Sequence, residues 1–128
     1  MDDKAYILSK KFRAAIERAK REGKLDSDPT LKYFPKACCG SASPLLAKFL
    51  YENGLITYEI NGIKRGEIAW DNQSHTWLML ENGHIIDITG DQFKSDMEFL
   101  CYSEKVYCGK MDEFHQLFDY AEIDVNKY

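Results

Sequence analysis

The chain has 128 residues, 45% of them hydrophobic and 30% charged, which is the balance of one soluble globular domain spanning residues 1–128. Its net charge of −4 gives no reason to expect nucleic acid as a ligand, because phosphate neutralisation requires clustered Lys and Arg. No apolar run reaches the length that spans a bilayer, and the acidic N-terminus lacks the apolar region of a signal peptide. We therefore expect a cytoplasmic protein without membrane contact, and export by a signal-less route stays open.

An amphipathic helix is predicted over Asp3–Arg21, where apolar residues recur at spacings of three and four. Gly23 is expected to end this helix. The polar segment Lys24–Pro35 then predicts a turn-rich loop. A second helix is predicted over Ser43–Asn53, where the apolar side chains form one stripe.

After the second helix, the apolar pattern changes to the alternation that is typical of strands. Residues 55–70 predict a hairpin that turns at Asn61-Gly62, and residues 75–89 predict another that turns at Glu81-Asn82-Gly83. A last strand is expected over residues 105–109 and a short helix over residues 111–123. Helices followed by a small antiparallel sheet define an α+β fold.

Two adjacent cysteines, Cys38 and Cys39, stand immediately before the second helix in the stretch "KACCGSAS". A thiol at this place can be a packed core residue, or it can be a nucleophile whose thiolate is favoured by the positive end of the helix dipole. Backbone N–H groups at a helix start can hold an oxyanion, and Gly40 permits close approach of a substrate. Cys101 and Cys108 lie far along the chain and are expected to be packing residues.

A thiol nucleophile needs a base and an orienting group, and the chain has three histidines. His84 falls at a hairpin tip and His115 in the last predicted helix, so both are expected to be solvated or packed. His75 opens a strand directly after a polar loop. Asp87 is flanked by isoleucines in the next strand, where a carboxylate is costly to bury unless it is paired. The sequence offers His75 as its partner.

The turn between these two strands decides whether His75 and Asp87 can meet. A three-residue loop with Gly83 in the left-handed conformation pairs Leu80 with His84. His75 and Asp87 then lie on one face of the hairpin as diagonal neighbours. A two-residue turn instead moves the register by one residue and sends the two side chains to opposite faces. The Asn-Gly pair favours the two-residue turn locally, whereas a catalytic triad requires the three-residue loop.

The chain carries a thiol at a helix start, then a histidine on a strand, and then a carboxylate on the following strand. Cys-His-Asp enzymes carry these groups in the same order. The segments "FPKACCGSASPLLAKFL", "SHTWLML" and "HIIDITGDQF" resemble small bacterial transglutaminase-like proteins of the papain-like superfamily. Their matching segments run approximately "FP-x-G-x-CG-x-AS", "HAWL" and "IIDITADQF", so the resemblance covers Phe34 to Phe93. It implies N-terminal helices packed on a small antiparallel β-sheet, with Cys39 as nucleophile, His75 as base and Asp87 as orienting residue.

Three positions beside these residues differ from the family pattern. None of the differences removes a catalytic atom. The positions are Ala37, Ser41 and Thr76. Cys38 remains a competing nucleophile. No glutamine stands shortly before the nucleophile, where papain-like peptidases keep an oxyanion donor. Backbone N–H groups, Gln73 or Gln92 would have to hold the oxyanion, and Gln92 is favoured. Trp70 and Trp77 are candidates to line the substrate cleft, although a tryptophan in a strand is more often a core residue.

The resemblance implies a thiol-dependent acyl-transfer enzyme without cofactor or metal. It would be a cysteine hydrolase or a transglutaminase-like amidase or transferase acting on a peptide, a protein or a small amide. A second interpretation is a non-catalytic binding or regulatory module on the same fold, such as an immunity or adaptor protein. A third is a zinc site, although the chain lacks C-x-x-C and H-x-x-x-H spacings. Its ligands would be Cys38 or Cys39 with His75, Cys101 or Cys108.

Overall fold

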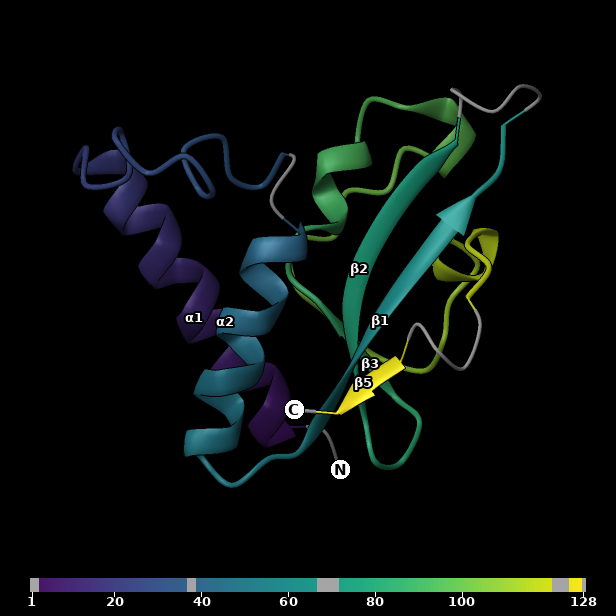
Figure 1. Ribbon diagram of the computed structural model, residues 1–128, viewed down its shortest axis with the longest axis horizontal. Coiled ribbons are helices and arrows are strands. Elements are labelled where there is room, and N and C mark those ends of the chain that lie inside the picture. Colours follow the sequence, from purple (N-terminus) through teal and green to yellow (C-terminus); the bar gives the residue numbers. More distant parts are fainter. Residues whose placement is uncertain (1–2, 37–38, 67–71, 121–124, 128) are drawn as a thin grey trace.

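The computed structural model describes residues 3–36, 39–66, 72–120 and 125–127 of the chain. Two helices come first, α1 (Asp3–Arg21) and α2 (Cys39–Glu52), and strands with short 3-10 helices follow (Figure 1). The strands form one antiparallel sheet in the order β4-β3-β2-β1-β5. The strand bounds are β1 (Thr57–Lys64), β2 (Gln73–Leu80), β3 (Ile85–Asp87), β4 (Tyr107–Gly109) and β5 (Val125–Lys127). The 3-10 helices are η2 (Gly90–Phe93), η3 (Met97–Phe99) and η4 (His115–Leu117). The predicted α+β fold class is confirmed.

Both predicted helices are present, but the second begins earlier than predicted. α1 has the expected bounds, whereas α2 begins at Cys39, four residues before Ser43. Small side chains build the additional turn, and Ala42 and Ser43 in it are buried. The Ser43 hydroxyl lies 3.4 Å from the backbone oxygen of Thr76 in β2, to which it donates. Cys39 is therefore the first residue of the helix and not part of the preceding loop.

The predicted hairpin at Asn61-Gly62 is wrong, because β1 runs through both residues and pairs with β2 from Thr57↔Leu80 to Lys64↔Gln73. A Cβ atom at Gly62 would lie 2.8 Å from Phe118 Cβ and 2.9 Å from Trp77 Cη2. Such distances are shorter than van der Waals contact allows, so the glycine permits close packing and does not form a turn. Trp70, which the predicted hairpin contained, lies outside the described residues.

The second predicted hairpin is confirmed in the register that brings His75 and Asp87 to one face. Gly83 has φ +87°, and the Leu80 N–H donates to the His84 oxygen over 2.7 Å. The paired residues Leu78 and Ile86 continue the same register. Glu81, Asn82 and Gly83 therefore form a three-residue loop, and the two-residue turn favoured by the Asn-Gly pair does not occur.

The sheet carries a hydrophobic core on each face. Residues of α1 and α2 pack against one face, where Leu78, Ile86 and Ile88 point. The chain after β3 covers the other face and supplies most of an aromatic-rich second core, which comprises Ile60, Trp77, Ile85, Phe93, Phe99, Phe114 and Phe118. Figure 1 shows α1 and α2 on one side of the strands and the segment around η4 on the other. The sequence predicted only the helical cover. Of the helix predicted over residues 111–123, the described part, residues 111–120, contains η4, and the rest lies outside the described residues.

Both edges of the sheet are short strands. β4 pairs with β3, and β5 pairs with β1, over three residues each. Further along β1, Ile63 exchanges two backbone hydrogen bonds of 2.8 Å with Asp119. The chain after the central hairpin therefore supplies both edge strands as well as the cover of the second face.

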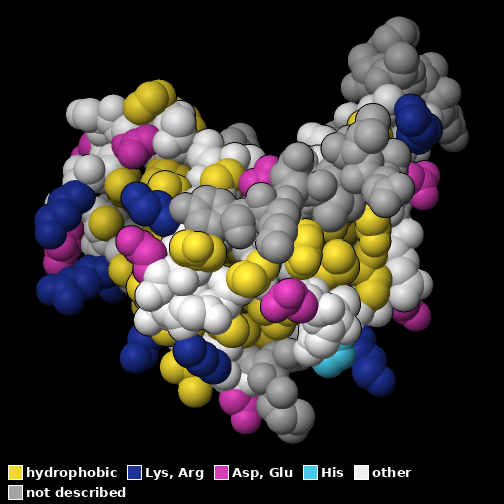
Figure 2. Space-filling model, turned by 60° about the horizontal axis from the view of Figure 1, so that its bottom comes forward, with side chains coloured by type: hydrophobic (Ala, Val, Ile, Leu, Met, Phe, Trp, Pro, Cys, Tyr) yellow, Lys and Arg dark blue, Asp and Glu magenta, His cyan; other side chains and the backbone are white. Residues whose placement is uncertain are grey.

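The surface mixes charged side chains with exposed apolar ones. On the face in Figure 2, hydrophobic side chains lie across the middle, and Lys and Arg side chains lie mainly toward the periphery. Ile7 and Tyr51 are among the exposed large apolar residues, and scattered exposed residues of this kind are normal in globular proteins. Within the described part of the chain, no helix combines the length and apolar character needed to cross a bilayer.

Candidate active site

The side chains of Cys39, His75 and Asp87 meet in one series of interacting groups. Cys39 opens α2, His75 lies in β2, and Asp87 ends β3. The Cys39 thiol interacts with His75, and His75 Nε2 lies 2.6 Å from Asp87 Oδ2. An ionised carboxylate can only accept, so the Nε2–H of His75 donates to Asp87. This leaves Nδ1 as the ring nitrogen available to the thiol.

The imidazole and the carboxylate are enclosed by protein, with His75 0% and Asp87 2% exposed. Burial alone would lower the pKa of His75, but the charge and hydrogen bond of Asp87, together with Cys39, raise it to about 9. Burial alone would raise the pKa of Asp87, but His75 and His115 hold it far below its usual range. His75 is therefore an imidazolium and Asp87 a carboxylate at neutral pH.

Cys39 is half-buried at the N-terminus of α2. Burial raises the pKa of its thiol, but the hydrogen bond and positive charge of His75, followed by a hydrogen bond from the Thr76 backbone, lower it below the usual value. The positive end of the helix dipole acts in the same direction. The Cys39 thiol therefore loses its proton more readily than an ordinary cysteine does.

Asp87 is held in place through both of its carboxylate oxygens. Oδ1 accepts a hydrogen bond of 2.9 Å from the Thr89 N–H. Oδ2 accepts from His75 and, over 2.7 Å, from Nε2 of His115. Gly90 leaves room for this arrangement, because a Cβ there would lie 2.6 Å from the ring of Tyr102 and 3.2 Å from Asp87 Oδ2. The carboxylate therefore has a fixed orientation toward the imidazole.

His115 is packed, as one of its two expected states, but it also belongs to the same network, which the sequence did not predict. It is 0% exposed, and its second nitrogen, Nδ1, lies 2.5 Å from Asp112 Oδ1. Burial would lower the pKa of His115, but Asp112 and Asp87 raise it. Both ring nitrogens face carboxylates, so His115 is an imidazolium. The only local signal was the spacing of three between Asp112 and His115, because the contact with Asp87 spans 28 residues of sequence.

The remaining predicted site residues fall into two groups. Gln92 is at the site, because its side-chain nitrogen lies 3.4 Å from Nδ1 of His75. Gly40 is exposed in the first turn of α2, and there is open space beside it. Trp77 is 1% exposed and packs its ring 5.7 Å from that of His75. It therefore supports the imidazole from the core and does not line an open cleft, which corrects the prediction. Gln73 is exposed at the start of β2.

The other cysteines and histidines lie elsewhere or outside the described residues. Cys38 lies outside the described residues, so the structure does not compare the two adjacent cysteines as nucleophiles. Cys101 is exposed and contacts Met97, and Cys108 is half-buried in β4. His84 is partly exposed beside the hairpin loop.

Among the described residues, the group of three or more possible metal ligands contains His75 but no cysteine. The ligand atoms of His75, Asp87 and His115 lie within 4.8 Å of one another. Two ligand atoms on one tetrahedral zinc ion are about 3.3 Å apart, given zinc–ligand bonds of about 2.0 Å. The carboxylate oxygen lies only 2.6 and 2.7 Å from the two nitrogens, which are hydrogen-bond distances. The group therefore suits shared protons better than a bridging metal.

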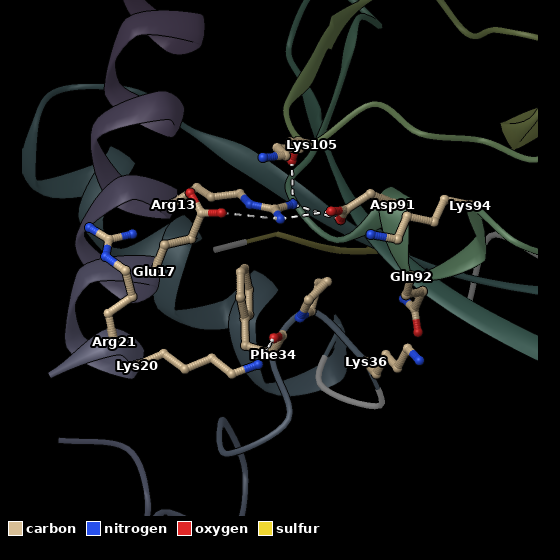
Figure 3. Close-up of a pocket in the computed structure, with 11 residues that line it drawn as sticks. Arg13, Glu17, Lys20, Arg21, Phe34, Lys36, Asp91, Gln92, Lys94 and Lys105 are labelled. Atoms are coloured by element: carbon tan, nitrogen blue, oxygen red, sulfur yellow. Dashed lines mark hydrogen bonds and ion pairs between the residues drawn. The ribbon is translucent and has the colours of Figure 1, made fainter. Parts of the chain in front are cut away.

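A cavity of about 310 Å³ adjoins the site through Gln92 (Figure 3). Side chains of α1 form one wall, and Phe34, Pro35 and Lys36 approach from the loop that precedes α2. Asp91 and Gln92 of η2 form another wall. Because Gln92 also contacts His75, this one side chain connects the wall of the cavity with the buried imidazole.

Comparison of the chain with protein-family models, with curated proteins and with solved structures found no significant match. The fold and the site therefore rest on the chain's own residues and geometry.

Proposed function

We propose that the chain is a thiol-dependent acyl-transfer enzyme with a papain-like or transglutaminase-like arrangement of Cys39, His75 and Asp87. The observation that carries the proposal is that the Cys39 thiol interacts with a buried imidazole that is itself hydrogen-bonded to a buried carboxylate. A packed structural cysteine has no need of a buried imidazolium held by a carboxylate. Such a pair is one of the arrangements that activate a thiol nucleophile.

The proposed reaction begins with attack of the Cys39 sulfur on the carbonyl carbon of an amide, ester or thioester. A carbon–sulfur bond forms, and the carbonyl electron pair moves to oxygen. Backbone N–H groups at the start of α2 point to where this oxyanion develops. His75 then gives its proton to the leaving amine, alcohol or thiol as the carbonyl re-forms. Water or an amine attacks the thioester next, His75 takes the proton of the attacking group, and the thiolate is released.

Gln92 is the side chain best placed to assist the oxyanion. Its amide nitrogen lies 3.4 Å from His75 Nδ1, on the side of the ring that faces the thiol, and the residue also lines the cavity. A neutral amide donor at this position complements a negative oxygen without changing the charge of the imidazolium.

The proposal predicts selective alkylation of Cys39 by iodoacetamide at pH 6. At this pH an ordinary thiol is almost entirely protonated, whereas a thiol with a lowered pKa remains reactive. The exposed Cys101 provides an internal reference in the same molecule. Peptide mapping by mass spectrometry should show Cys39 modified at least tenfold faster than Cys101. In His75→Gln the two rates should become similar.

Equal rates at Cys39 and Cys101 in the wild-type protein would refute the proposal. Faster modification of Cys38 would transfer the nucleophile to that residue. Circular dichroism of His75→Gln serves as the control that the variant remains folded.

The complete burial of His75 supports a second candidate function, a non-catalytic binding module that keeps the charged network as part of its core. In that case Cys39→Ser and His75→Gln would change thermal stability, and no electrophilic acyl probe would label the wild-type protein. Labelling by such a probe that depends on Cys39 would exclude the module.

A further inference from the structure

The cavity beside Gln92 concentrates positive charge in an acidic protein. The chain has a net charge of −4. Two acidic residues, Glu17 and Asp91, line the cavity. The basic residues that line it are Arg13, Lys20, Arg21, Lys36, Lys94 and Lys105. This local excess of cations is opposite in sign to the molecule as a whole, and it favours an anionic occupant.

Some of these cations are already engaged, and others are not. Arg13 is bound by both carboxylate oxygens of Asp91 over 2.7 Å, and Lys20 donates to the Phe34 oxygen over 2.7 Å. Lys36 and Lys94 are exposed, and neither has an ion-pair partner among the described residues. These two ammonium groups are therefore available to a ligand.

The available lysines stand beside Gln92, the lining residue that contacts His75. In Figure 3, Gln92 lies between Lys36 and Lys94. Gln92 contacts His75, and Lys36 precedes Cys39 by three residues. A ligand held by the two lysines would therefore reach toward the imidazole and the sulfur across Gln92.

We propose that this cavity binds an anionic group of the substrate, a phosphate or a carboxylate, while the acyl carbon lies at Cys39. The inference rests on the proposed function and adds the substrate class. Lysine ammonium groups act as point charges with rotatable donors, so they accept tetrahedral phosphate as well as planar carboxylate. The volume of about 310 Å³ lies at the small end of ligand pockets, which suits an anionic group with a few attached atoms.

Calorimetric titration of the unmodified protein with inorganic pyrophosphate, and separately with glutarate, tests the binding itself. We expect saturable binding of at least one anion and about tenfold weaker binding in Lys36→Gln/Lys94→Gln, because each lost ion pair reduces affinity severalfold. The matched control is Lys48→Gln/Lys110→Gln, which removes two exposed lysines that do not line the cavity. Tighter binding of pyrophosphate would identify phosphate as the preferred group, and tighter binding of glutarate would identify carboxylate. Absence of saturable binding, or equal loss in the control, would overturn the inference.

A second measurement separates this inference from the proposed function. Iodoacetate and iodoacetamide alkylate a thiolate by the same displacement of iodide, but only iodoacetate is anionic. We expect the iodoacetate-to-iodoacetamide rate ratio at Cys39 to fall severalfold in Lys36→Gln/Lys94→Gln and to stay unchanged in the control. Rapid alkylation by iodoacetamide with an unchanged ratio would overturn the anion site alone. Anion binding with an unreactive Cys39 would overturn the proposed function, and with it the assignment of the anion to an acyl substrate.

Discussion

Asp87 accepts hydrogen bonds from two buried imidazolium groups, and this double pairing defines the charge state of the site. His75 donates to it from β2 and His115 donates to it from η4. Asp112 balances His115 from the far side. Each buried charge therefore has an opposite charge within hydrogen-bond distance, which offsets much of the cost of enclosing it.

At the scale of single residues, the substitution Asp87→Asn should slow the alkylation of Cys39. Loss of the carboxylate removes the interaction that raises the pKa of His75 to about 9, so burial lowers that pKa. The imidazole becomes neutral near pH 7 and no longer lowers the thiol pKa. We expect the iodoacetamide rate at pH 6 to fall about tenfold or more, and the midpoint of the rate–pH profile to move upward. Asp119→Asn, at an exposed residue bonded through its backbone, is the control, and an unchanged midpoint in Asp87→Asn would refute this account of the thiol.

The motif order identified the three residues of the series, but it could not identify His115. A histidine and a carboxylate on adjacent strands are separated by a short hairpin, so register arguments can relate them. The contact between His115 and Asp87 depends on how the whole segment after β3 folds back, and no periodic pattern encodes that path.

At the scale of elements, the chain contains two Asn-Gly pairs that the fold uses differently. Asn82-Gly83 completes a three-residue loop, whereas Asn61-Gly62 lies inside β1. Local turn preference was decisive in neither case. The pairing of His75 with Asp87 accompanies the first outcome, and the aromatic packing over Gly62 accompanies the second. Strand pairing beyond the nearest neighbours was therefore the part of the fold that local sequence could not predict.

Gly62→Ala tests this use of the glycine. The added methyl group would overlap the Trp77 ring and the Phe118 Cβ, so we expect a loss of about 1–3 kcal/mol in the free energy of unfolding. Gly40→Ala is the matched control, since no heavy atom lies within 4 Å of the added group and alanine favours a helix. Urea denaturation of both variants measures the difference. Equal stability of the two would mean that Gly62 has another role.

At the scale of the whole molecule, Arg13 connects the helical layer with the chain that follows the central hairpin. Its guanidinium is buried and donates to Asp91, to the Ile88 oxygen and to the Lys105 oxygen. One side chain of α1 thus fixes η2, which carries Gln92, and the approach to β4. The sequence predicted the helix but assigned no role to a charged residue on its apolar face.

Arg13→Met should destabilise the fold by about 3–5 kcal/mol, because Asp91 would remain buried without its partner. The double variant Arg13→Met/Asp91→Leu should recover part of this loss, since it removes both charges. Arg18→Met, at an exposed residue of the same helix, should have little effect. Thermal unfolding followed by circular dichroism gives the comparison. A double variant no more stable than the single one would show that the carbonyl contacts, and not the ion pair, are what stabilise the connection.

The arrangement of the sheet borders also bears on how the protein behaves at high concentration. Unpaired backbone at a long, flat border is the template by which one polypeptide recruits another into fibrils. Here the outermost strands offer only three residues each, and the free stretch of β1 is occupied at Ile63 by Asp119. Little backbone is left in the described ranges for a neighbouring copy to join, so the fold itself resists self-assembly through its sheet.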